Sequence, residues 1–357
     1  MTADCFISVS AATVLDSVKI LLLQLKRIGD LILTTPAIAA LRERFPDAEV
    51  TMVVSSECAD LLPAIGSVDR ILMARRYLRD LAAFLAVAGK RFDYCIDFTR
   101  NDRSAALAFL SGARKRIVSY RVRDQAKNRA RLYTDFVDVR MRDLHTIDYN
   151  LSLLEPLGIR DVSRSLRLQL PESAREKADA LRRNWNINKP CIVLHPGSAR
   201  QEKLWEPGRW AQVIERFGRN DNFDLVLTSG AGKHEQAHIT AIKSRTHQPI
   251  VDLSGKIDLL TLAALIEQAR LLVTVDSAPV HLAAAAHTPQ VTLFGPTNPF
   301  HWRPRESPAF ILHGKSPEPV TEFLPLQPRL QMSQISTEAV ISAIDSLLSQ
   351  HAAARTS

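Results

Sequence analysis

The chain has 357 residues, of which 46% are hydrophobic and 24% charged, and it carries a formal net charge of +8. This is the composition of an ordinary folded protein, and the length allows two domains, each with its own core. No stretch approaches the roughly 20 apolar residues of a membrane-spanning helix, and the start of the chain lacks the basic segment of a signal peptide. We therefore expect a cytoplasmic protein in which residues 1–17 form a disordered extension.

The first half of the sequence alternates apolar runs with helical patterns. Residues 18–25 are apolar enough for a strand buried on both faces, and after a glycine turn residues 31–46 carry a helical stripe. Such an alternation predicts a mostly parallel sheet covered by helices. The further strands are expected at residues 49–55, 70–74, 94–98 and 115–120, with a helix over residues 78–91.

A second series of the same kind follows a polar, charged stretch that ends near residue 190. Each of its strands ends in a small, polar or glycine-containing loop that opens a helix, which is typical of a Rossmann-like unit. We therefore expect an α/β protein with two Rossmann-like domains, over residues 18–170 and 171–334, and a ligand in the cleft between them. We expect a last helix over residues 335–350, which could pack back on the first domain. Ser336 or Thr337 could cap it.

Residues 234–238 read HEQAH, which matches the zinc-protease pattern H-E-x-x-H. Two histidines four apart on a helix could hold Zn²⁺ while the glutamate acts as general base. However, the pattern stands in the first turn of its helix, and the next histidine, His247, lies in a polar stretch expected to be a surface loop. The neighbouring GAGK fails as a phosphate-binding P-loop, because that pattern needs glycine in place of Leu227 and serine or threonine in place of His234.

Glu235 remains as a carboxylate at the mouth of a strand-to-helix loop. It could accept both hydroxyls of a ribose, as acidic residues do in dinucleotide-binding folds, or it could simply complement the helix N-terminus. Two further loops of the same domain suit phosphates. The first reads HPGSARQEK, a Gly-Ser loop with Lys203 close by. The second reads VDSAPVHLAAA and provides Asp276, Ser277 and the amides that open the next helix. Together these loops indicate a nucleotide diphosphate held without a metal.

The segment RIGD follows the first strand and brings a carboxylate to the other side of the expected cleft. Asp30 comes directly after Gly29, where the main chain turns tightly at the start of a helix. The carboxylate could cap that helix, since aspartate is a favoured N-cap. Alternatively, it could act as a general base that takes a proton from an acceptor hydroxyl.

Between Arg100 and Arg131 lie ten basic residues and only two acidic ones, a local excess of 10 − 2 = +8 that equals the net charge of the whole chain. This segment could be a solvated face, or it could contact an anionic membrane surface, a phosphorylated ligand or nucleic acid. Nucleic acid is the weakest of these interpretations, because only Tyr120 and Tyr133 interleave with the charges and no recognition motif is present.

The four cysteines, Cys5, Cys58, Cys95 and Cys191, are widely spaced and form no C-x-x-C pair. Cys95 and Cys191 lie inside apolar, strand-like runs. The spacing therefore favours buried reduced thiols over a disulfide or metal set.

Several blocks of this sequence resemble one family. They read LKRIGDLILTTPAI, LHPGSARQEKLW, LVLTSGAGKHE, and VDSAPVHLAAA with VTLFGPT and WRPR. The blocks are similar to segments of the glycosyltransferases that add heptose to the inner core of lipopolysaccharide. The order and spacing of the blocks fit over residues 18–348. The D-S-A-P-x-H form and the TSG loop are most similar to the third group of these heptosyltransferases. One departure is Ala278, where some members have glycine, and a contact through its backbone amide survives that change.

The resemblance implies a GT-B architecture, an ADP-heptose donor bound by the second domain, and inversion without a metal or other cofactor. It implies an acceptor on the first domain, the lipopolysaccharide inner core on lipid A, reached from the anionic cytoplasmic face of the inner membrane. A nucleotide-sugar epimerase of similar shape and a non-catalytic ADP-sugar-binding protein stay open as alternatives. Carried over by motif, the site residues are Asp30 as catalytic base; Ser198, Lys203, Ser277 and Ala278 at the donor phosphates; Glu235 at the ribose; Asp276 and His281 at the heptose; Ile257 beside adenine; and Arg121 and Arg123 at the acceptor.

Overall fold

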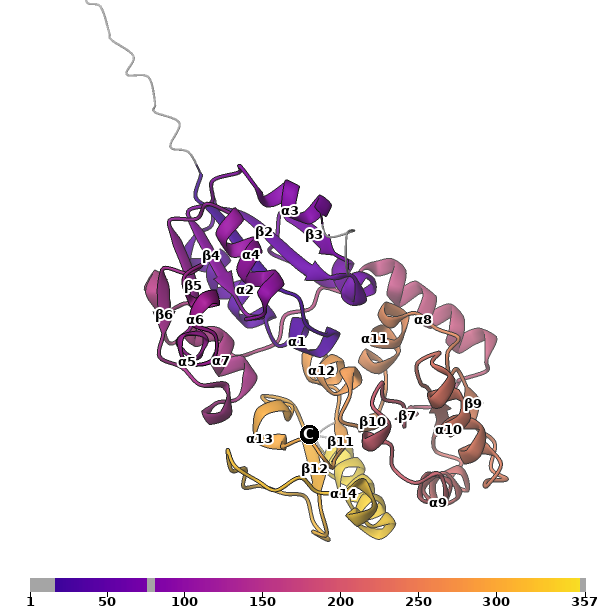
Figure 1. The fold of residues 1–357 in the computed structure, drawn as a ribbon. Coiled ribbons are helices and arrows are strands. Elements are labelled where there is room, and N and C mark those ends of the chain that lie inside the picture. Colours follow the sequence, from indigo (N-terminus) through magenta and orange to yellow (C-terminus); the bar gives the residue numbers. More distant parts are fainter. Residues whose placement is uncertain (1–16, 76–80, 354–357) are drawn as a thin grey trace, which may run out of the picture.

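The computed structural model describes residues 17–75 and 81–353. The disordered extension expected at residues 1–17, and Cys5 with it, therefore lies outside the described residues apart from Ser17. Within those ranges the chain forms two six-stranded sheets, one from each half of the sequence (Figure 1).

The first sheet has the strand order β3-β2-β1-β4-β5-β6, and all of its paired strands are parallel. This is the doubly wound order, in which the direction of winding reverses between the first and fourth strands and leaves a ligand crevice at their carboxyl ends. Its strands are β1 (Lys19–Gln24), β2 (Glu49–Ser55), β3 (Arg70–Ala74), β4 (Tyr94–Asp97), β5 (Lys115–Ser119) and β6 (Asp135–Val137).

The second sheet repeats this topology. Its order is β12-β11-β10-β7-β8-β9, again with parallel pairs, so β7 and β10 flank the second reversal. Two such sheets confirm the expected α/β fold of two Rossmann-like units. The strands are β7 (Cys191–His195), β8 (Asp224–Leu227), β9 (Val251–Asp252), β10 (Leu271–Val275), β11 (Gln290–Phe294) and β12 (Ala309–His313).

Helices cover both faces of the sheets. The helices of the first half are α1 (Ile28–Ile32), α2 (Thr35–Arg44), α3 (Leu81–Val87), α4 (Asp102–Leu110), α5 (Arg121–Gln125), α6 (Lys127–Ala130) and α7 (Thr146–Ser152). Those of the second half are α8 (Glu172–Asn184), α9 (Pro207–Gly218), α10 (Lys233–Lys243), α11 (Leu259–Glu267), α12 (Ala278–Ala285), α13 (Pro299–Trp302) and α14 (Thr337–Ala353). The short 3₁₀ helices are η1 (Ser56–Ala64), η3 (Met141–Asp143), η4 (Glu155–Leu157), η5 (Gln201–Lys203) and η6 (Met332–Gln334).

Strand β1 is buried on both faces, as its apolar run predicts. Ile20 and Leu22 belong to the cluster under α1 and α2, whereas Leu21 and Leu23 belong to the cluster under α3 and α4. All four side chains are fully buried. Each contributes about 1.5–3 kcal/mol relative to an exposed side chain, which holds β1 at the centre of its sheet.

The helix expected over residues 31–46 is broken into α1 and α2. Pro36 has no N–H to bond to the carbonyl of Ile32, and the hydroxyl of Thr35 donates to that carbonyl instead, at 2.7 Å. The hydroxyl of Thr34 likewise donates to the carbonyl of Asp30, at 2.8 Å. The break keeps α1 short, so that this helix ends at Ile32, two residues after Asp30.

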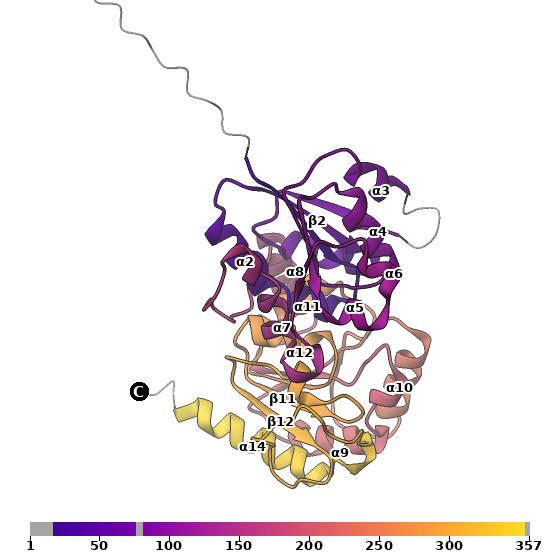
Figure 2. The ribbon, with the colours of Figure 1, turned by 60° about the vertical axis from the view of Figure 1, so that its left-hand side comes forward.

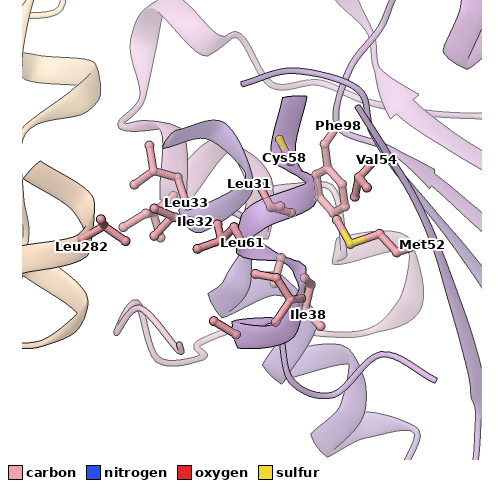
Figure 3. Packing of buried hydrophobic residues seen from close by; sticks show 14 of the residues in the cluster. Leu31, Ile32, Leu33, Ile38, Met52, Val54, Cys58, Leu61, Phe98 and Leu282 are labelled. Atoms are coloured by element: carbon pink, nitrogen blue, oxygen red, sulfur yellow. The ribbon is translucent and has the colours of Figure 1, made fainter. Parts of the chain in front are cut away.

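The two halves share one apolar cluster. Helix α1 contacts α12, and η1 contacts α11. Figure 3 shows Leu282 of α12 beside Ile32 and Leu33, and all three side chains are buried in the same cluster. The first turn after β1 is therefore anchored in both halves of the chain.

The last helix packs differently from our expectation. Ser336 caps α14, because its hydroxyl accepts the backbone N–H of Ala339 at 3.1 Å. However, α14 does not lie on the first half. It packs on α9, β11 and β12 of the second half, where Val340 and Ile344 are fully buried (Figure 2). These side chains complete the core beneath the second sheet, so that helix closes its own domain.

The elements that the sequence did not predict include α4, α8, β6 and β12. Helix α8 lies within the stretch interpreted as a polar boundary. Its buried side is formed by Ala174 and Ala178, which pack with Ala264 of α11. No helix in the described ranges is long and apolar enough to cross a membrane.

Candidate active site between the two halves

The loops that follow β1 and β10 meet at the boundary of the two halves. Gly29 lies after β1, and His281 lies on α12 after β10. A Cβ atom added to Gly29 would come within 2.9 Å of Cδ2 and 3.3 Å of Nε2 of His281. The imidazole thus packs against the backbone that carries Asp30, and no side chain fits between them.

Asp30 lies in the first turn of α1, and its side chain is 14% exposed. Arg27 occupies the N-cap position of α1, so Asp30 does not cap this helix. Burial raises the pKa of the Asp30 carboxyl, and the charge of Lys26, the backbone N–H of Arg27 and the charge of Lys203 oppose that rise. The Nζ atom of Lys26 is 3.8 Å from Oδ1 of Asp30.

Lys203 ends η5 in the second half and forms an ion pair with Asp276, which follows β10 directly. Its Nζ lies 2.5 Å from Oδ2 of Asp276 and donates to the Asp276 carbonyl at 3.2 Å. Only 13% and 8% of the two side chains are exposed. A buried pair of this kind balances two charges that would each be costly alone. It holds a cation beside the N-terminus of α12, where Ser277 is the N-cap and Ala278 the first residue.

His281 lies one turn into α12, and its side chain is buried. Burial lowers the pKa of the imidazole to about 4; Asp276 opposes this shift and Lys203 adds to it. The ring is therefore neutral near pH 7, and its Nδ1 has no hydrogen-bond partner within the described part of the chain. A neutral ring with an unused nitrogen at this boundary can orient a hydroxyl without adding charge.

Glu235 is enclosed by glycines from two loops. Its Oε1 accepts the backbone N–H of Gly230 at 3.2 Å. A Cβ atom on Gly197 would lie 2.6 Å from Oε1, and one on Gly230 would lie 2.5 Å from Oε2. The loops after β7 and β8 can therefore approach the carboxylate only because they have no side chains at these positions.

The HEQAH pattern has a structural explanation at its first two residues. Nε2 of His234 is 2.8 Å from the carbonyl of Ser198, which links α10 to the loop after β7. Ser198 is buried, and its hydroxyl accepts the N–H of Arg200 at 3.2 Å. His238 is buried on α10, while His247 is exposed and its N–H donates to Glu215 at 2.8 Å. Residues 17–75 and 81–353 contain no group of three or more side chains suited to hold a metal ion.

Ile257 lies between β9 and α11, half-buried against the shared cluster. Its loop touches the loop that precedes α10 and Glu235, because the N–H of Gly255 donates to the carbonyl of Ser229 at 3.0 Å. The expected donor-site residues thus follow the carboxyl ends of strands in the second sheet: Ser198, Lys203, Glu235, Asp276 and Ile257.

Arg121 and Arg123 begin α5, after β5 of the first sheet. The guanidinium carbon of Arg123 lies 4.1 Å from the ring centroid of Phe136, so part of its charge is committed to a local cation–π contact. Arg121 is half-buried and Arg123 exposed. The basic residues whose charges act on Asp30 are instead Lys26, Arg27 and Lys203. Arg100 lies close to Lys26, and neither Lys26 nor Arg100 was among the site residues expected from the sequence.

The sequence and fold of this chain match those of known glycosyltransferases. The family model of glycosyltransferase family 9 (heptosyltransferase) matches residues 81–321. Two curated relatives from Escherichia coli, both lipopolysaccharide heptosyltransferase 3, are 27% and 29% identical over 90% and 91% of this chain and 96% of their own lengths.

Solved structures agree with this match. A glycosyl transferase family 9 protein from Veillonella parvula is 25% identical, with a TM-score of 0.79 over 94% of this chain and 98% of its own. E. coli heptosyltransferase WaaC, solved with ADP, shares the fold at 19% identity, with a TM-score of 0.68 over 92% of this chain and 97% of its own. Because the family model spans more than half of the sequence, this chain belongs to glycosyltransferase family 9, the heptosyltransferase family.

Proposed function

We propose that this chain transfers heptose from ADP-heptose to a heptose of the lipopolysaccharide inner core, with inversion at the anomeric carbon and with Asp30 as general base. The observation that carries the proposal is the position of Asp30. It belongs to the first half, yet it lies near enough to Lys203 of the second half for the two charges to interact. The two E. coli relatives support heptose as the sugar and lipopolysaccharide as the acceptor.

We assign the donor to the second half. The N-terminus of α12 favours an anion, because its first N–H groups have no partner within the helix and its dipole is positive there. The ADP in the WaaC structure supports a nucleotide diphosphate as the leaving group. The assigned contacts are Ser198, Lys203, Ser277 and Ala278 for the phosphates, Glu235 for the ribose, Ile257 for adenine, and Asp276 and His281 for the heptose.

The charges suggest the mechanism. Ionised Asp30 takes the proton from the acceptor hydroxyl, and the oxygen attacks the anomeric carbon from the face opposite the phosphate. The bond to ADP breaks, and the charge that develops on its phosphate is stabilised by Lys203 and the N-terminus of α12, each charge-assisted hydrogen bond contributing about 1.5–3 kcal/mol. A single displacement inverts the configuration. It requires neither a covalent enzyme intermediate nor a metal.

We assign the acceptor to the first half and the site of action to the cytoplasmic face of the inner membrane. The basic segment from Arg100 to Arg131, which includes Arg121 and Arg123, supports this assignment, because anionic lipids and a phosphorylated core attract such a segment. The partners are then ADP-heptose, the core acceptor on lipid A and an anionic membrane surface, with no role for nucleic acid.

A transfer assay with purified ADP-heptose and core acceptor tests this function. We expect Asp30→Asn to bind ADP-heptose about as tightly as the wild type but to lose turnover, while the exposed Asp47→Asn keeps it. Wild-type turnover in the Asp30 variant would remove Asp30 from the mechanism. Conversion of ADP-heptose without acceptor would indicate an epimerase, and loss of activity on chelation would contradict a metal-independent reaction.

A further inference from the structure

Lys26 and Arg100 begin next to each other at the carboxyl edge of the first sheet. Lys26 follows Leu25 and Arg100 follows Thr99, and the N–H of Leu25 donates to the hydroxyl of Thr99 at 2.7 Å. That hydroxyl in turn donates to the carbonyl of Leu23 at 3.2 Å. The loops after β1 and β4 are therefore joined by hydrogen bonds, and Lys26, which follows this point, lies near both Asp30 and Arg100.

The guanidinium of Arg100 is held in place but poorly paired. Its central carbon lies 5.1 Å from the ring centroid of Tyr149, which is fully buried. Its Nε is buried and has no hydrogen-bond partner in the described part of the chain, and its Nη2 donates to the sulfur of Met141 at 3.7 Å. Within residues 17–75 and 81–353, Arg100 forms no ion pair, because the nearby Asp97 already accepts the N–H groups of Thr99 and Arg100 and the hydroxyl of Tyr133.

The backbone at Arg100 is also unusual. Its φ is +67°, in the left-handed region that glycine or asparagine adopts more readily than arginine. Backbone strain of this kind persists where the surrounding structure maintains it. Two hydrogen bonds maintain it: the N–H donates to Oδ1 of Asp97 at 3.0 Å, and the carbonyl accepts from Nη1 of Arg129 at 2.9 Å.

The cationic groups at this point have carboxylates nearby but no close side-chain partner among them. Lys26, whose side chain is 22% exposed, lies near the carboxylates of Asp30 and Asp97, and its Nζ is 3.8 Å from Oδ1 of Asp30, which is too long for a hydrogen bond. Arg100 adds a second cation close enough to disfavour the charged form of Lys26 and so to lower its pKa, although burial lowers that pKa more. Two neighbouring cations, of which the guanidinium has a buried N–H group without a partner in the described part of the chain, are suited to receive an anionic ligand, and a guanidinium can bind phosphate or carboxylate through two N–H groups at once.

We propose that Lys26 and Arg100 form a subsite for an anionic group of the acceptor, a phosphate monoester or a carboxylate, beside the hydroxyl that Asp30 deprotonates. The inference rests on the proposed function, because it places the acceptor on the first half. An anion held there positions its own sugar ring next to the general base. It also keeps the donor phosphates, which Lys203 and α12 hold in the second half, separate from the acceptor charge.

The test compares Arg100→Met with Arg70→Met in the full chain. Arg70 is a matched control: it is exposed, it lies outside the basic segment, and it begins β3 at the amino edge of the same sheet. We expect Arg100→Met to raise the KM for core oligosaccharide roughly tenfold or more and to leave ADP affinity unchanged, and Arg70→Met to change neither. Arg100→Gly, which suits the left-handed backbone, is a second variant that separates loss of the side chain from misfolding.

Two treated acceptors identify the anion. If it is a phosphate, wild-type KM rises when the core is dephosphorylated, and Arg100→Met no longer distinguishes treated from untreated core. If it is a carboxylate, reduction of the core's carboxyl groups has that effect and dephosphorylation has none. An unchanged acceptor KM in both Arg100 variants, or a loss of ADP affinity as large as the loss for the acceptor, would overturn the subsite.

A binding measurement separates this inference from the proposed function. Titration calorimetry with untreated core oligosaccharide requires no turnover, so it remains decisive if the wild type transfers no heptose and the proposed function fails. Binding that weakens in Arg100→Met and Lys26→Met but not in Arg70→Met supports the subsite. Equal binding by all four proteins contradicts it.

Discussion

The imidazole of His281 lies against the backbone of Gly29, in the space where any larger residue would begin its side chain. A Cβ atom at Gly29 would come within 2.9 Å of the ring. This contact joins the loop that carries Asp30 to the helix whose N-terminus we assign to the donor phosphates. The proposed base and the proposed donor site therefore lie on two elements that touch directly.

Gly29→Ala tests that contact. The added methyl must displace the buried ring of His281 or separate the two halves, and a displacement of even 1 Å between reacting groups can cost on the order of a hundredfold in rate. We expect kcat to fall by that order while ADP affinity, which depends on the second half, changes little. Gly208→Ala in α9 is the control, because a Cβ atom there meets nothing within 4 Å. Wild-type kcat in Gly29→Ala would mean that the contact does not position the base.

As the proposed general base, Asp30 must be ionised to accept a proton, so we expect the pH dependence of kcat to report on its carboxyl. Burial raises the pKa of its carboxyl, while Lys26, the backbone N–H of Arg27, the Arg27 side chain and Lys203 lower it. His281, neutral near pH 7, adds no charge on that side. Lys26→Met removes the strongest of the opposing charges, so the pKa rises further and the acidic limb of the kcat profile moves to higher pH. An acidic limb that stays in place, or that moves to lower pH, would contradict Asp30 as the titrating base.

Lys203→Ala removes a cation that we assign to the leaving phosphate and that also neutralises Asp276. Both effects weaken the binding of ADP, because one charge-assisted hydrogen bond is lost and the carboxylate left behind repels the phosphates. We expect ADP affinity to fall about ten- to a hundredfold, measured by titration calorimetry. Lys189→Ala, which removes an exposed lysine paired with Asp221, should bind ADP normally. Unchanged affinity in the Lys203 variant would remove that residue from the phosphate site.

Much of this fold was predictable because its central strands are buried on both faces. Continuous apolar runs such as residues 18–25 have one interpretation in a chain of alternating elements. Helix α8 escaped notice because its buried side consists of Ala174 and Ala178, which leave no stripe of large apolar residues. The sequence also could not indicate which surface the last helix covers, since its pattern predicts a helix whatever partner it packs on.

The site was predictable in the second half and less so in the first. The charged residues of this half follow strand ends, and they are Lys203, Glu235 and Asp276. The parallel topology brings the carboxyl ends of the strands to one edge of the sheet. Lys26 and Arg100 are 74 positions apart in the sequence, and the pairing of β1 with β4 and the hydrogen bond between Leu25 and Thr99 bring them together. No local pattern marks such a pair, because neither residue belongs to a motif of its own.

A second connection between the halves lies at Asp148 on α7. Its Oδ1 is 2.5 Å from Nε of Arg164, in the segment that joins the halves, and its Oδ2 binds Nη1 of Arg305 in the second half. Two backbone carbonyls reinforce the connection: that of Arg303 lies 3.0 Å from Nε2 of His145, and that of Leu144 lies 2.9 Å from Nδ1 of His301. The conformation in which Asp30 approaches the second half is therefore fastened by a carboxylate on another element.

Asp148→Asn should loosen this connection and let the halves separate. Burial works to raise the pKa of Asp148, but the hydrogen bonds and charges of Arg164 and Arg305 outweigh it and hold that pKa below its usual range. The wild-type connection is thus present at neutral pH and is lost as the pH falls through the lowered pKa, whereas the amide lacks the charge at every pH. We expect a larger radius of gyration by small-angle X-ray scattering and a roughly tenfold lower kcat, because the base then spends less time near the donor. Asp143→Asn is the control, since Asp143 pairs at 3.4 Å only with its exposed neighbour Arg142. If Asp148→Asn matches the wild type in both scattering and kcat, the pairing is a local surface contact that does not govern how the halves meet.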